Sequence, residues 1–551
     1  MKRFLLFALA LVISGTSYSQ HLISATYKRS YTTVQIDSIY NSLGLPQGIL
    51  PNQYPVKLYK IVYNTVAVDS VTPTIASGLM VVPDGNMACK LSLMMYAHGT
   101  VHLKTGVPSN EQAEYIVGIA CAAAGYVAAL PDYLGLGDSP GMHPYIHARS
   151  EATACIDMIR ASKEAAAQLN KQLSGQVFLT GYSQGGHASM ATHKWIQNHF
   201  STEFDVSAAV PMSGPYSLSH VMKDLILSNT PYSQPNYLPY VILSFRYAYN
   251  IYPNLSDVFV APYDTLLPPL FQGLNGGGAI DAVMPSVPKL IMQPALLDTF
   301  ELDSNHIFRK LLKESDLYDW KPIKPTTMLY CEADEQVSYL NTIEAYNFMN
   351  SIGAPNVYKL SINPTLGHVD CARFAMLYMR SVFDSLRYDK MQFNSTIQNP
   401  TEFGATNGSI DLYFTGGKPP YTYNWSNGFM GQDPTGLAAG PYTVIVTDAL
   451  GCQFTANYTL NNPFGIENQT NDEWIVFPNP AKEVLYIKFA DKSFLGGNVS
   501  MVDTHGRLIY NQKLTSDNFA IQTAGLAKGL YMITLHSGSG KLLHQKIVIG
   551  D

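Results

Sequence analysis

The stretch 175–196, with the sequence GQVFLTGYSQGGHASMATHKWI, constrains the fold of this chain more than any other. Its first part, 177–180, is apolar and predicts a strand, and the small residues after Gly186 predict a helix. Between them lies a Gly-Tyr-Ser-Gln-Gly turn, whose glycines let backbone approach too closely for a Cβ atom. Gly-x-Ser-x-Gly between a strand and a helix is typical of a nucleophile elbow, a strained turn that projects the serine hydroxyl from the sheet. The sequence therefore predicts Ser183 as a nucleophile. The alternative is a glycine-rich turn in some other α/β domain.

The segments around this turn alternate between predicted strands and helices. The predicted sheet strands are 56–64 and 74–82 at an antiparallel edge, then 91–97, 126–130, 177–180, 206–212, 326–331 and 357–362. The predicted helices are 34–43, 111–124, 147–173, 372–386 and two that begin at 186 and 341. This alternation is typical of an α/β fold, with a mostly parallel sheet covered by helices on both sides. The segment 215–321, rich in Pro, Tyr and Leu, interrupts the pattern, so we expect it to form a cap over the active edge of the sheet.

An elbow serine needs a base and an orienting acid, which follow it in the order Ser, acid, His. The histidines after Ser183 in the α/β part are His187, His193, His199, His220, His306 and His368. The first three lie on the elbow helix and the next two in the cap insertion, so only His368 follows a predicted core strand. The order therefore predicts His368 as the base. The alternative is a polar residue at the N-terminus of a helix.

The acid should lie just past a strand between the serine and the histidine. Asp334 does so, and its carboxylate would hold the imidazole tautomer and stabilise the imidazolium. Glu332 and Glu335 are close enough in sequence to be rivals. The other interpretation of Asp334 is a helix N-cap.

Stabilising the oxyanion requires two backbone N–H donors. The residue after the nucleophile, Gln184, is expected to supply one donor. Gly99 or Thr100, after the strand 91–97, is expected to supply the other. His98 is then structural rather than catalytic.

Three further residues are candidates for substrate binding. Asp132 and Tyr133 end the neighbouring strand at the same edge of the sheet, where they would either contact substrate or, as we favour, hold the loop by hydrogen bonds. Tyr182, beside the serine, is the third candidate.

None of the six cysteines forms a CxxC pair, so no metal site is expected. Cys331 ends the strand before Asp334, and Cys371 lies three residues after His368. If the acid and the base meet, these two loops are adjacent, which predicts a Cys331–Cys371 disulfide. The alternative is a pair of buried thiols.

The N-terminus carries an export signal. Lys2 and Arg3 precede the apolar run 4–13 and a small-residue zone at 15–20, which together predict a signal peptide over 1–20. About ten apolar residues are too few to span a bilayer, so no transmembrane anchor is expected. The net charge is −6 with no basic cluster, so nucleic acid is not an expected partner.

Beyond about 389 the chain becomes rich in Thr, Asn, Gly and Tyr. Alternating segments at 409–415, 421–425 and 442–447 predict a small β-sandwich over 396–462. A polar linker at 461–473 separates it from a second all-β block over 474–551.

These residues together resemble the α/β-hydrolase superfamily, and within it the secretory lipases and related exported esterases. The motifs that carry the resemblance are YAHGT at 96–100, PDYLGLG at 131–137, GYSQGGHA at 181–188, ADEQV at 333–337 and GH at 367–368. The resemblance covers about 25–386 and implies hydrolysis of a carboxylic ester with Ser183, Asp334 and His368 as the triad, without a cofactor or metal. The cap at 215–321 departs from the subfamily patterns, and it would set the acyl or alcohol specificity.

The rest of the chain carries two more resemblances. The segment 415–460, with GKPPYTYNWSNG at 417–428 and VTDALGC at 446–452, resembles the immunoglobulin-like repeat of gliding-motility adhesins. The segment 476–549, with FPNP at 477–480 and GLAKGLY at 525–531, resembles the C-terminal sorting domain of type IX secretion substrates. This resemblance implies handling by the type IX secretion machinery and a secreted or cell-surface location.

The sequence thus predicts a secreted lipase-like or esterase-like hydrolase acting on a small-molecule or lipid ester. Its hydrolase domain would span 21–390, followed by the repeat at 396–462 and the sorting domain at 474–551. A serine peptidase on the same fold and a non-catalytic surface adhesin remain alternatives. The apolar residues of the cap favour an apolar acyl or aryl group, or else they only pack the cap.

Overall fold

The computed structural model describes residues 20–46, 48–462 and 474–550. The predicted signal peptide, except its last residue, and most of the predicted linker at 461–473 lie outside the described residues. The chain divides into two compact units. The first is Met1–Asn394 with Tyr413–Asn424 and Ile445–Ala456, and the second is Ser395–Leu412 with Trp425–Val444 and Asn457–Asp551. This division passes through the repeat predicted at 396–462.

A nine-stranded sheet forms the core of the first unit, in the order β1-β2-β3-β5-β4-β6-β7-β8-β9. Its strands are β1 (Leu22–Tyr31), β2 (Val56–Val66), β3 (Pro73–Pro83), β4 (Leu91–Ala97), β5 (Tyr126–Pro131), β6 (Leu173–Tyr182), β7 (Asp205–Met212), β8 (Thr326–Cys331) and β9 (Val357–Asn363). Strands β4 to β9 pair in parallel, and β1, β2 and β3 form an antiparallel edge that joins β5. The predicted α/β fold with a mostly parallel sheet is confirmed.

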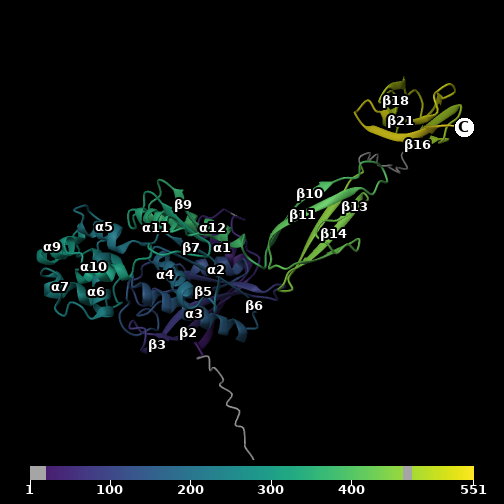
Figure 1. Ribbon diagram of the computed structural model, residues 1–551. Coiled ribbons are helices and arrows are strands. Elements are labelled where there is room, and N and C mark those ends of the chain that lie inside the picture. Colours follow the sequence, from purple (N-terminus) through teal and green to yellow (C-terminus); the bar gives the residue numbers. More distant parts are fainter. Residues whose placement is uncertain (1–19, 47, 463–473, 551) are drawn as a thin grey trace, which may run out of the picture. The chain divides into compact units, whose positions relative to one another are not determined.

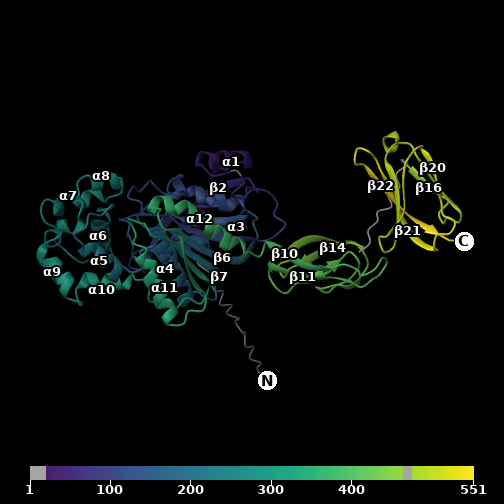
Figure 2. The same cartoon turned by 90° about the horizontal axis from the view of Figure 1, so that it is seen from above.

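Helices cover both faces of this sheet (Figures 1 and 2). One face packs against α1 (Thr33–Ser42), α2 (Tyr115–Ala123) and α12 (His368–Asp384). The other packs against α3 (Ala148–Gln168), α4 (Gln184–His199) and α11 (Leu340–Ser351). The burial of apolar side chains between these layers stabilises the unit.

Several boundaries differ from the sequence-based expectation. Strand β1 was not predicted, because only Leu22 in it is buried and its side chains do not alternate clearly. Helix α2 begins at Tyr115 rather than at 111, since Glu111, Ala113 and Glu114 have positive φ angles that a helix does not accept. Strand β6 begins at Leu173, inside the stretch predicted as helix.

The segment predicted as a cap is helical. Its elements are η2 (Leu218–Met222), α5 (Lys223–Leu227), α6 (Tyr237–Tyr249), η3 (Leu255–Asp257), α7 (Tyr263–Leu270), α8 (Gly277–Asp281), η4 (Pro288–Ile291), α9 (Pro294–Leu302) and α10 (Ile307–Glu314). These helices bury a core of their own, in which Phe245, Phe259 and Phe300 are fully buried. Figure 2 shows them as a group at one end of the sheet. The cap is therefore an autonomous packing layer inserted between β7 and β8.

The strands after α12 form small sheets. They are β10 (Met391–Gln398), β11 (Gly408–Gly416), β12 (Thr422–Trp425), β13 (Thr435–Leu437), β14 (Gly440–Thr447), β15 (Gln453–Leu460), β16 (Trp474–Phe477), β17 (Val484–Phe489), β18 (Asn498–Asp503), β19 (Leu508–Lys513), β20 (Asn518–Gln522), β21 (Gly529–His536) and β22 (Leu542–Ile549), with η5 (Lys492–Phe494). They pair as β10-β11-β13, β12-β14-β15, β16-β17-β20 and β19-β18-β21-β22. The predicted all-β character of this region is confirmed.

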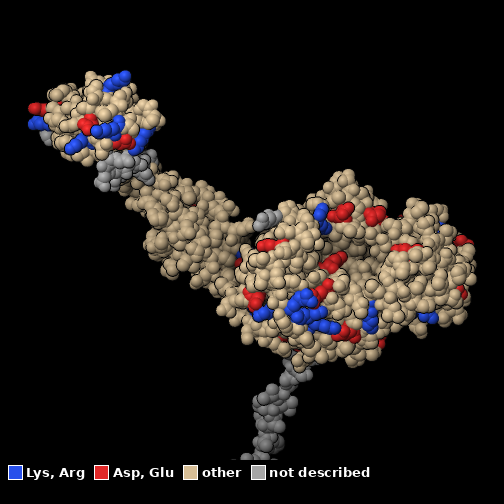
Figure 3. Space-filling model, turned by 180° about the vertical axis from the view of Figure 1, so that it is seen from behind, with Lys and Arg blue, Asp and Glu red and all other residues tan. Residues whose placement is uncertain are grey.

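The surface of the first unit carries both signs of charge. Figure 3 shows Lys and Arg interspersed with Asp and Glu on its visible face. Within the described residues, no helix has the length and apolar character that a membrane crossing needs.

Candidate active site

Ser183 lies in the sharp turn between β6 and α4. Its φ and ψ angles of 59° and −121° are unusual for a residue with a side chain, a strain of about 1–3 kcal/mol that the surrounding structure must hold. The N–H of Ser183 donates to the carbonyl of Met212 at 3.0 Å, and its own carbonyl accepts from the N–H of His187 at 3.2 Å. Neighbouring strand and helix thus both fix the turn.

Two glycines allow this turn to press against the end of β4. A Cβ atom on Gly185 would lie 1.9 Å from the carbonyl oxygen of Ala97, and one on Gly181 would lie 2.3 Å from the carbonyl oxygen of Gly185. No side chain fits at either position. The glycines of the motif are therefore required by close backbone contact.

His368 is the first residue of α12, so this helix begins four residues before the predicted start at 372. Its Nδ1 lies 2.7 Å from Oδ2 of Asp334, and both side chains are almost completely buried. The hydroxyl of Tyr182 donates to the carbonyl of His368 at 2.6 Å. Because Tyr182 precedes Ser183 directly, this bond holds the start of α12 beside the elbow.

Asp334 is the carboxylate that reaches the imidazole. Its Oδ1 accepts from the backbone N–H groups of Gln336 at 3.0 Å and Val337 at 2.8 Å, which orients Oδ2 towards His368. The rival Glu335 contacts the same histidine differently, since its Oε2 accepts the backbone N–H of His368 at 2.9 Å. The two acidic residues therefore fix the imidazole and the helix start separately.

A disulfide between Cys331 and Cys371 braces these two loops, with a Cα–Cα distance of 6.0 Å. It joins the end of β8, three residues before Asp334, to the first turn of α12. A second disulfide, Cys89–Cys452, lies within the first unit and was not predicted.

The backbone N–H groups of Gly99 and Thr100 differ in whether they are already hydrogen-bonded within the protein. The N–H of Gly99 donates to Oε2 of Glu114 at 3.1 Å, so it is engaged within the protein. The N–H of Thr100 has no acceptor among the described residues. Of the two, Thr100 is the better partner for Gln184. Glu114, which the sequence analysis missed, also accepts the hydroxyl of Tyr96 at 2.7 Å.

A buried polar network lies behind the elbow. Glu151 on α3 accepts from Nε2 of Gln184 at 2.9 Å and from Nδ1 of His187 at 2.6 Å. Nε2 of Gln184 also lies 2.8 Å from Nε2 of His143, whose Nδ1 lies 2.8 Å from the carbonyl of Leu134. Burial lowers the pKa of His143 to about 4, so its imidazole is neutral and can donate at Nδ1 while accepting at Nε2. Nothing local in the sequence marked Glu151 or His143.

The three candidate substrate-binding residues all turn inward. Asp132 is fully buried and accepts from the hydroxyl of Ser77 at 2.6 Å and the N–H of Ser109 at 3.0 Å. Burial raises the pKa of Asp132. The hydroxyl of Tyr133 donates to the carbonyl of His98 at 2.9 Å. These residues, like Tyr182, hold loops in place, which for Asp132 and Tyr133 is the interpretation that the sequence favoured.

The side chains over Ser183 come mainly from the cap. A cavity of about 60 Å³ adjoins the serine. Its lining residues are Tyr145, Ile146, Ser183, Gln184, Pro215, Leu218, Met222, Leu225, Ile226, Tyr232, Tyr237, Leu238, Val241, Pro288, Leu312 and Val337. None of these carries a charged side chain. Sequence reasoning expected an apolar cap but did not single out these residues.

Comparisons with known proteins agree with this geometry. Residues 103–357 match the family model described as secretory lipase. A rice cell wall degrading esterase, LipA from Xanthomonas oryzae, is 30% identical in a solved structure, with 67% of this chain and 98% of that chain covered and a TM-score of 0.59. The chain belongs to the secretory lipase family. A putative hydrolase from Legionella pneumophila is 28% identical, with 66% and 97% covered and a TM-score of 0.62.

The C-terminal part of the chain also has family matches. Residues 394–429 match the SprB repeat, and residues 475–550 match the secretion system C-terminal sorting domain. Comparison with curated proteins found no match. The chain is thus a lipase- or esterase-like hydrolase with a sorting domain, which makes it a secreted or cell-surface protein. The three predicted resemblances are confirmed.

Proposed function

We propose that this protein hydrolyses carboxylic esters through an acyl-enzyme on Ser183, with His368 as the base and Asp334 as the orienting acid. The hydrogen bond between Nδ1 of His368 and Oδ2 of Asp334, at 2.7 Å beside a strained serine elbow, carries this proposal. An imidazole held at Nδ1 by a carboxylate has Nε2 free to take a proton.

In the proposed mechanism, Nε2 of His368 takes the hydroxyl proton while Oγ of Ser183 attacks the ester carbonyl carbon. The C–O bond to the alcohol then breaks, and the imidazolium gives its proton to the leaving oxygen. Water attacks the acyl-enzyme in the same way and releases the acid. Asp334 keeps the imidazole in the required tautomer throughout.

The backbone N–H groups of Gln184 and Thr100 are the proposed donors to the tetrahedral oxyanion. Gln184 begins α4, so its N–H points out of the helix N-terminus, where a developing negative charge is favoured. The bond from Gly99 to Glu114 supports this choice, because it fixes the loop that presents Thr100.

The cavity supports an ester rather than a peptide substrate. A peptidase that holds a chain terminus needs a charged partner, and the described lining residues offer none. The cavity of about 60 Å³ is far below the roughly 300–1,000 Å³ of sites that enclose drug-sized ligands. An apolar acyl group would therefore enter only with movement of cap side chains.

The test is hydrolysis of p-nitrophenyl esters with acyl chains of graded length, measured for the wild type, Ser183→Ala and Ser189→Ala. Ser189 is a buried serine further along α4, so its variant controls for packing. We expect turnover in the wild type and in Ser189→Ala, and none in Ser183→Ala. A fluorophosphonate should label the wild type at Ser183.

Each alternative makes a different prediction in this assay. A serine peptidase would be labelled at Ser183 and would cleave peptides as well as activated esters, whereas an esterase would leave peptides uncleaved. A surface adhesin would neither turn over esters nor react with the fluorophosphonate.

We also propose that the hydrolase domain spans 21–390, with the cap at 215–321. The repeat at 396–462 and the sorting domain at 474–551 contribute no catalytic group.

A further inference from the structure

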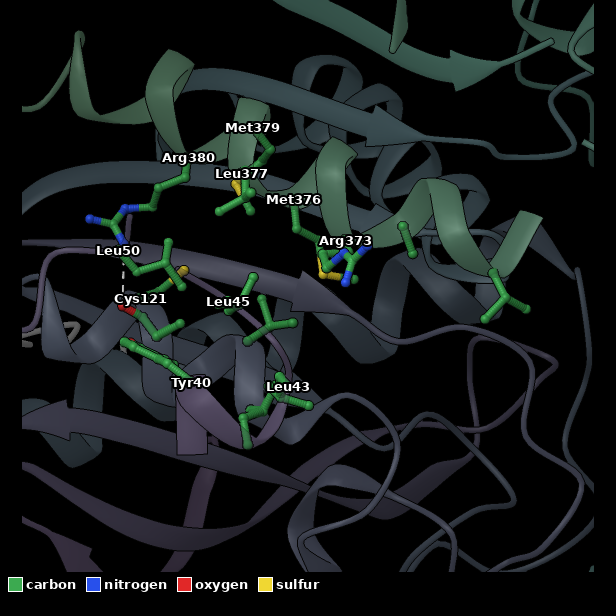
Figure 4. Close-up of a pocket in the computed structure, with 15 residues that line it drawn as sticks. Tyr40, Leu43, Leu45, Leu50, Cys121, Arg373, Met376, Leu377, Met379 and Arg380 are labelled. Atoms are coloured by element: carbon green, nitrogen blue, oxygen red, sulfur yellow. Dashed lines mark hydrogen bonds between the residues drawn. The ribbon is translucent and has the colours of Figure 1, made fainter. Parts of the chain in front are cut away.

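A second pocket lies beside helix α12, whose first residue is His368. It is enclosed by α1, by the loop after it, by α2 and by α12, and its volume is about 280 Å³ (Figure 4). None of its lining residues lines the cavity at Ser183. The pocket therefore needs an explanation separate from the proposed hydrolysis.

The pocket is long and apolar. Its lining along α12 runs from Val369 to Arg380, eleven positions that correspond to about 16 Å at 1.5 Å per residue. The facing wall is formed by leucines of the loop after α1, with Leu45 and Leu50 labelled in Figure 4. Leu43 and Val369 are 46% and 72% exposed, so the pocket opens to solvent. A narrow apolar groove of this kind fits a single alkyl chain.

One end of the pocket holds two buried polar groups without partners. The hydroxyl of Tyr40 and Nε of Arg380 have no hydrogen-bond partner among the described residues, and each residue is only 5% exposed. A buried donor left unpaired costs about 1–3 kcal/mol, so such groups usually meet a ligand or a neighbour. Two of them lining one pocket indicate a binding site.

Both unpartnered groups are donors. Burial raises the pKa of Tyr40 above its usual value, so its phenol stays protonated, and the guanidinium of Arg380 is always charged. The other nitrogens of Arg380 are engaged, at 3.3 Å from the carbonyl of Ala120 and 3.0 Å from Oδ2 of Asp384. The free Nε–H and O–H can therefore each donate to an acceptor on a ligand.

A second cation lines the same pocket. Arg373 is exposed and contacts the ring of Phe374 at 4.8 Å, but it forms no ion pair within the described part of the chain. It adds positive potential near the mouth. This charge favours an anionic ligand over a neutral or cationic one.

We propose that this pocket binds a single-chain alkyl carboxylate. The alkyl chain lies along α12 between Leu45 and Met376, and the carboxylate oxygens accept hydrogen bonds from the hydroxyl of Tyr40 and from Nε of Arg380. The proposal does not depend on the chemistry at Ser183. Occupancy does, however, place the ligand against the first turn of α12, which begins with His368.

The test is calorimetric titration of the full-length Ser183→Ala protein with dodecanoate below its micelle concentration. This protein cannot form an acyl-enzyme, and the variants described below separate binding in this pocket from binding in the cavity over Ser183. We expect one dodecanoate to bind, and dodecanol and dodecyltrimethylammonium to bind at least tenfold more weakly. Equal binding of dodecanol would overturn the proposed recognition of an anion, and no binding of dodecanoate would overturn the site.

Three variants locate the binding. Tyr40→Phe removes a hydroxyl that bonds nothing in the protein, so it should fold normally and lose about tenfold or more in dodecanoate affinity. Tyr378→Phe changes an exposed tyrosine on α12 that does not line the pocket, and should bind as the wild type does. Ala372→Trp should fill the groove and abolish binding. Unchanged affinity in both Tyr40→Phe and Ala372→Trp would place dodecanoate elsewhere and contradict the proposal.

Discussion

The two sides of Ser183 are built from different chemistry. On the sheet side, Glu151 and Gln184 are buried and Glu114 is half-buried, and these polar side chains form hydrogen bonds of 2.7 to 3.1 Å. On the cap side, the serine faces aliphatic and aromatic side chains from helices that pack on a core of their own. The sheet side therefore fixes geometry, and the cap side offers mainly apolar shape, with few directional bonds such as those that the hydroxyls of Tyr232 and Tyr237 donate to Gln336.

This difference has a physical cause. Hydrogen bonds between buried groups are directional and costly to break, so a network of them holds atoms in one arrangement. Apolar contacts are non-directional and tolerate repacking. We infer that the sheet side governs whether the reaction proceeds, whereas the cap side governs which acyl group is accepted.

The largest effect is expected for Asp334→Asn on the sheet side. Loss of the carboxylate from Nδ1 of His368 should favour the wrong imidazole tautomer and lower kcat by about 10⁴-fold. The matched variant is Glu335→Gln, which alters the bonds to the backbone N–H of His368 and to the side chain of Gln336 but not the bond at Nδ1, and should cost at most about tenfold. The measurement is kcat on the best p-nitrophenyl ester. Equal losses in the two variants would argue against Asp334 as the orienting acid.

The next effect is expected for Glu151→Ala. This change leaves Nε2 of Gln184 and Nδ1 of His187 without their buried acceptor, which should lower the free energy of unfolding by about 3–5 kcal/mol. Glu203→Ala is the control, because Glu203 pairs with Arg160 at the surface with 40% of its side chain exposed, and its loss should cost about 0–1 kcal/mol. Urea unfolding followed by circular dichroism compares them. Similar losses of unfolding free energy in the two variants would mean that the buried network behind the elbow stabilises the protein no more than a surface ion pair does.

A smaller effect is expected from His193, which lies on α4 behind the elbow. Burial, with a further contribution from Lys324, lowers the pKa of His193 to about 3. As the pH falls below about 6.5, the unfolded chain binds this proton and the folded chain does not, so stability is lost between pH 6.5 and pH 3. Between pH 8 and pH 5 this amounts to about 2 kcal/mol.

The variant His193→Gln should therefore reduce the difference in unfolding free energy between pH 8 and pH 5. His199→Gln, at an exposed position on the same helix, should leave that difference unchanged. Unfolding in urea at the two pH values measures both. If the two variants respond alike, the buried imidazole does not account for the acid sensitivity of this layer.

Much of the fold could be predicted because the decisive signals are local. The continuous apolar run 91–97 predicted β4 with the bounds that the structure shows, since a strand buried on both faces leaves no polar interruption. Strand β1 was not predicted, because an edge strand with one weakly buried face has no continuous apolar run. The start of α12 at His368 was not predicted, because its N-cap is Gly367, which has no side chain to form a capping hydrogen bond.

The site residues also divide into those that the sequence predicted and those that it did not. The chain order of residue types singled out Ser183, Asp334 and His368, and the structure joins the last two by a hydrogen bond. Glu114 and Glu151 gave no signal, because their contacts reach 15 and 33 positions along the chain and depend on how α2 and α3 pack. Apolar cap residues are equally hidden, since composition does not tell which of them face the serine.

The smallest effect on activity is expected on the cap side, from Leu218→Ala. Leu218 lines the cavity and is 4% exposed, so its truncation enlarges the space over Ser183. We expect a several-fold shift of kcat/KM towards longer acyl chains, because each added methylene gains contact in the larger space. Stability should also fall by about 2–5 kcal/mol, as for other buried leucines.

Leu302→Ala is the matched control for this change. Leu302 lies in the same cap but is 84% exposed and does not line the cavity, so neither the chain-length preference nor stability should change. The measurement is the ratio of kcat/KM for dodecanoyl and butanoyl esters of p-nitrophenol. A ratio that moves in Asp334→Asn but not in Leu218→Ala would reverse the division, since selection would then reside with the polar side of the serine. A ratio that moves only in Leu218→Ala would sharpen it.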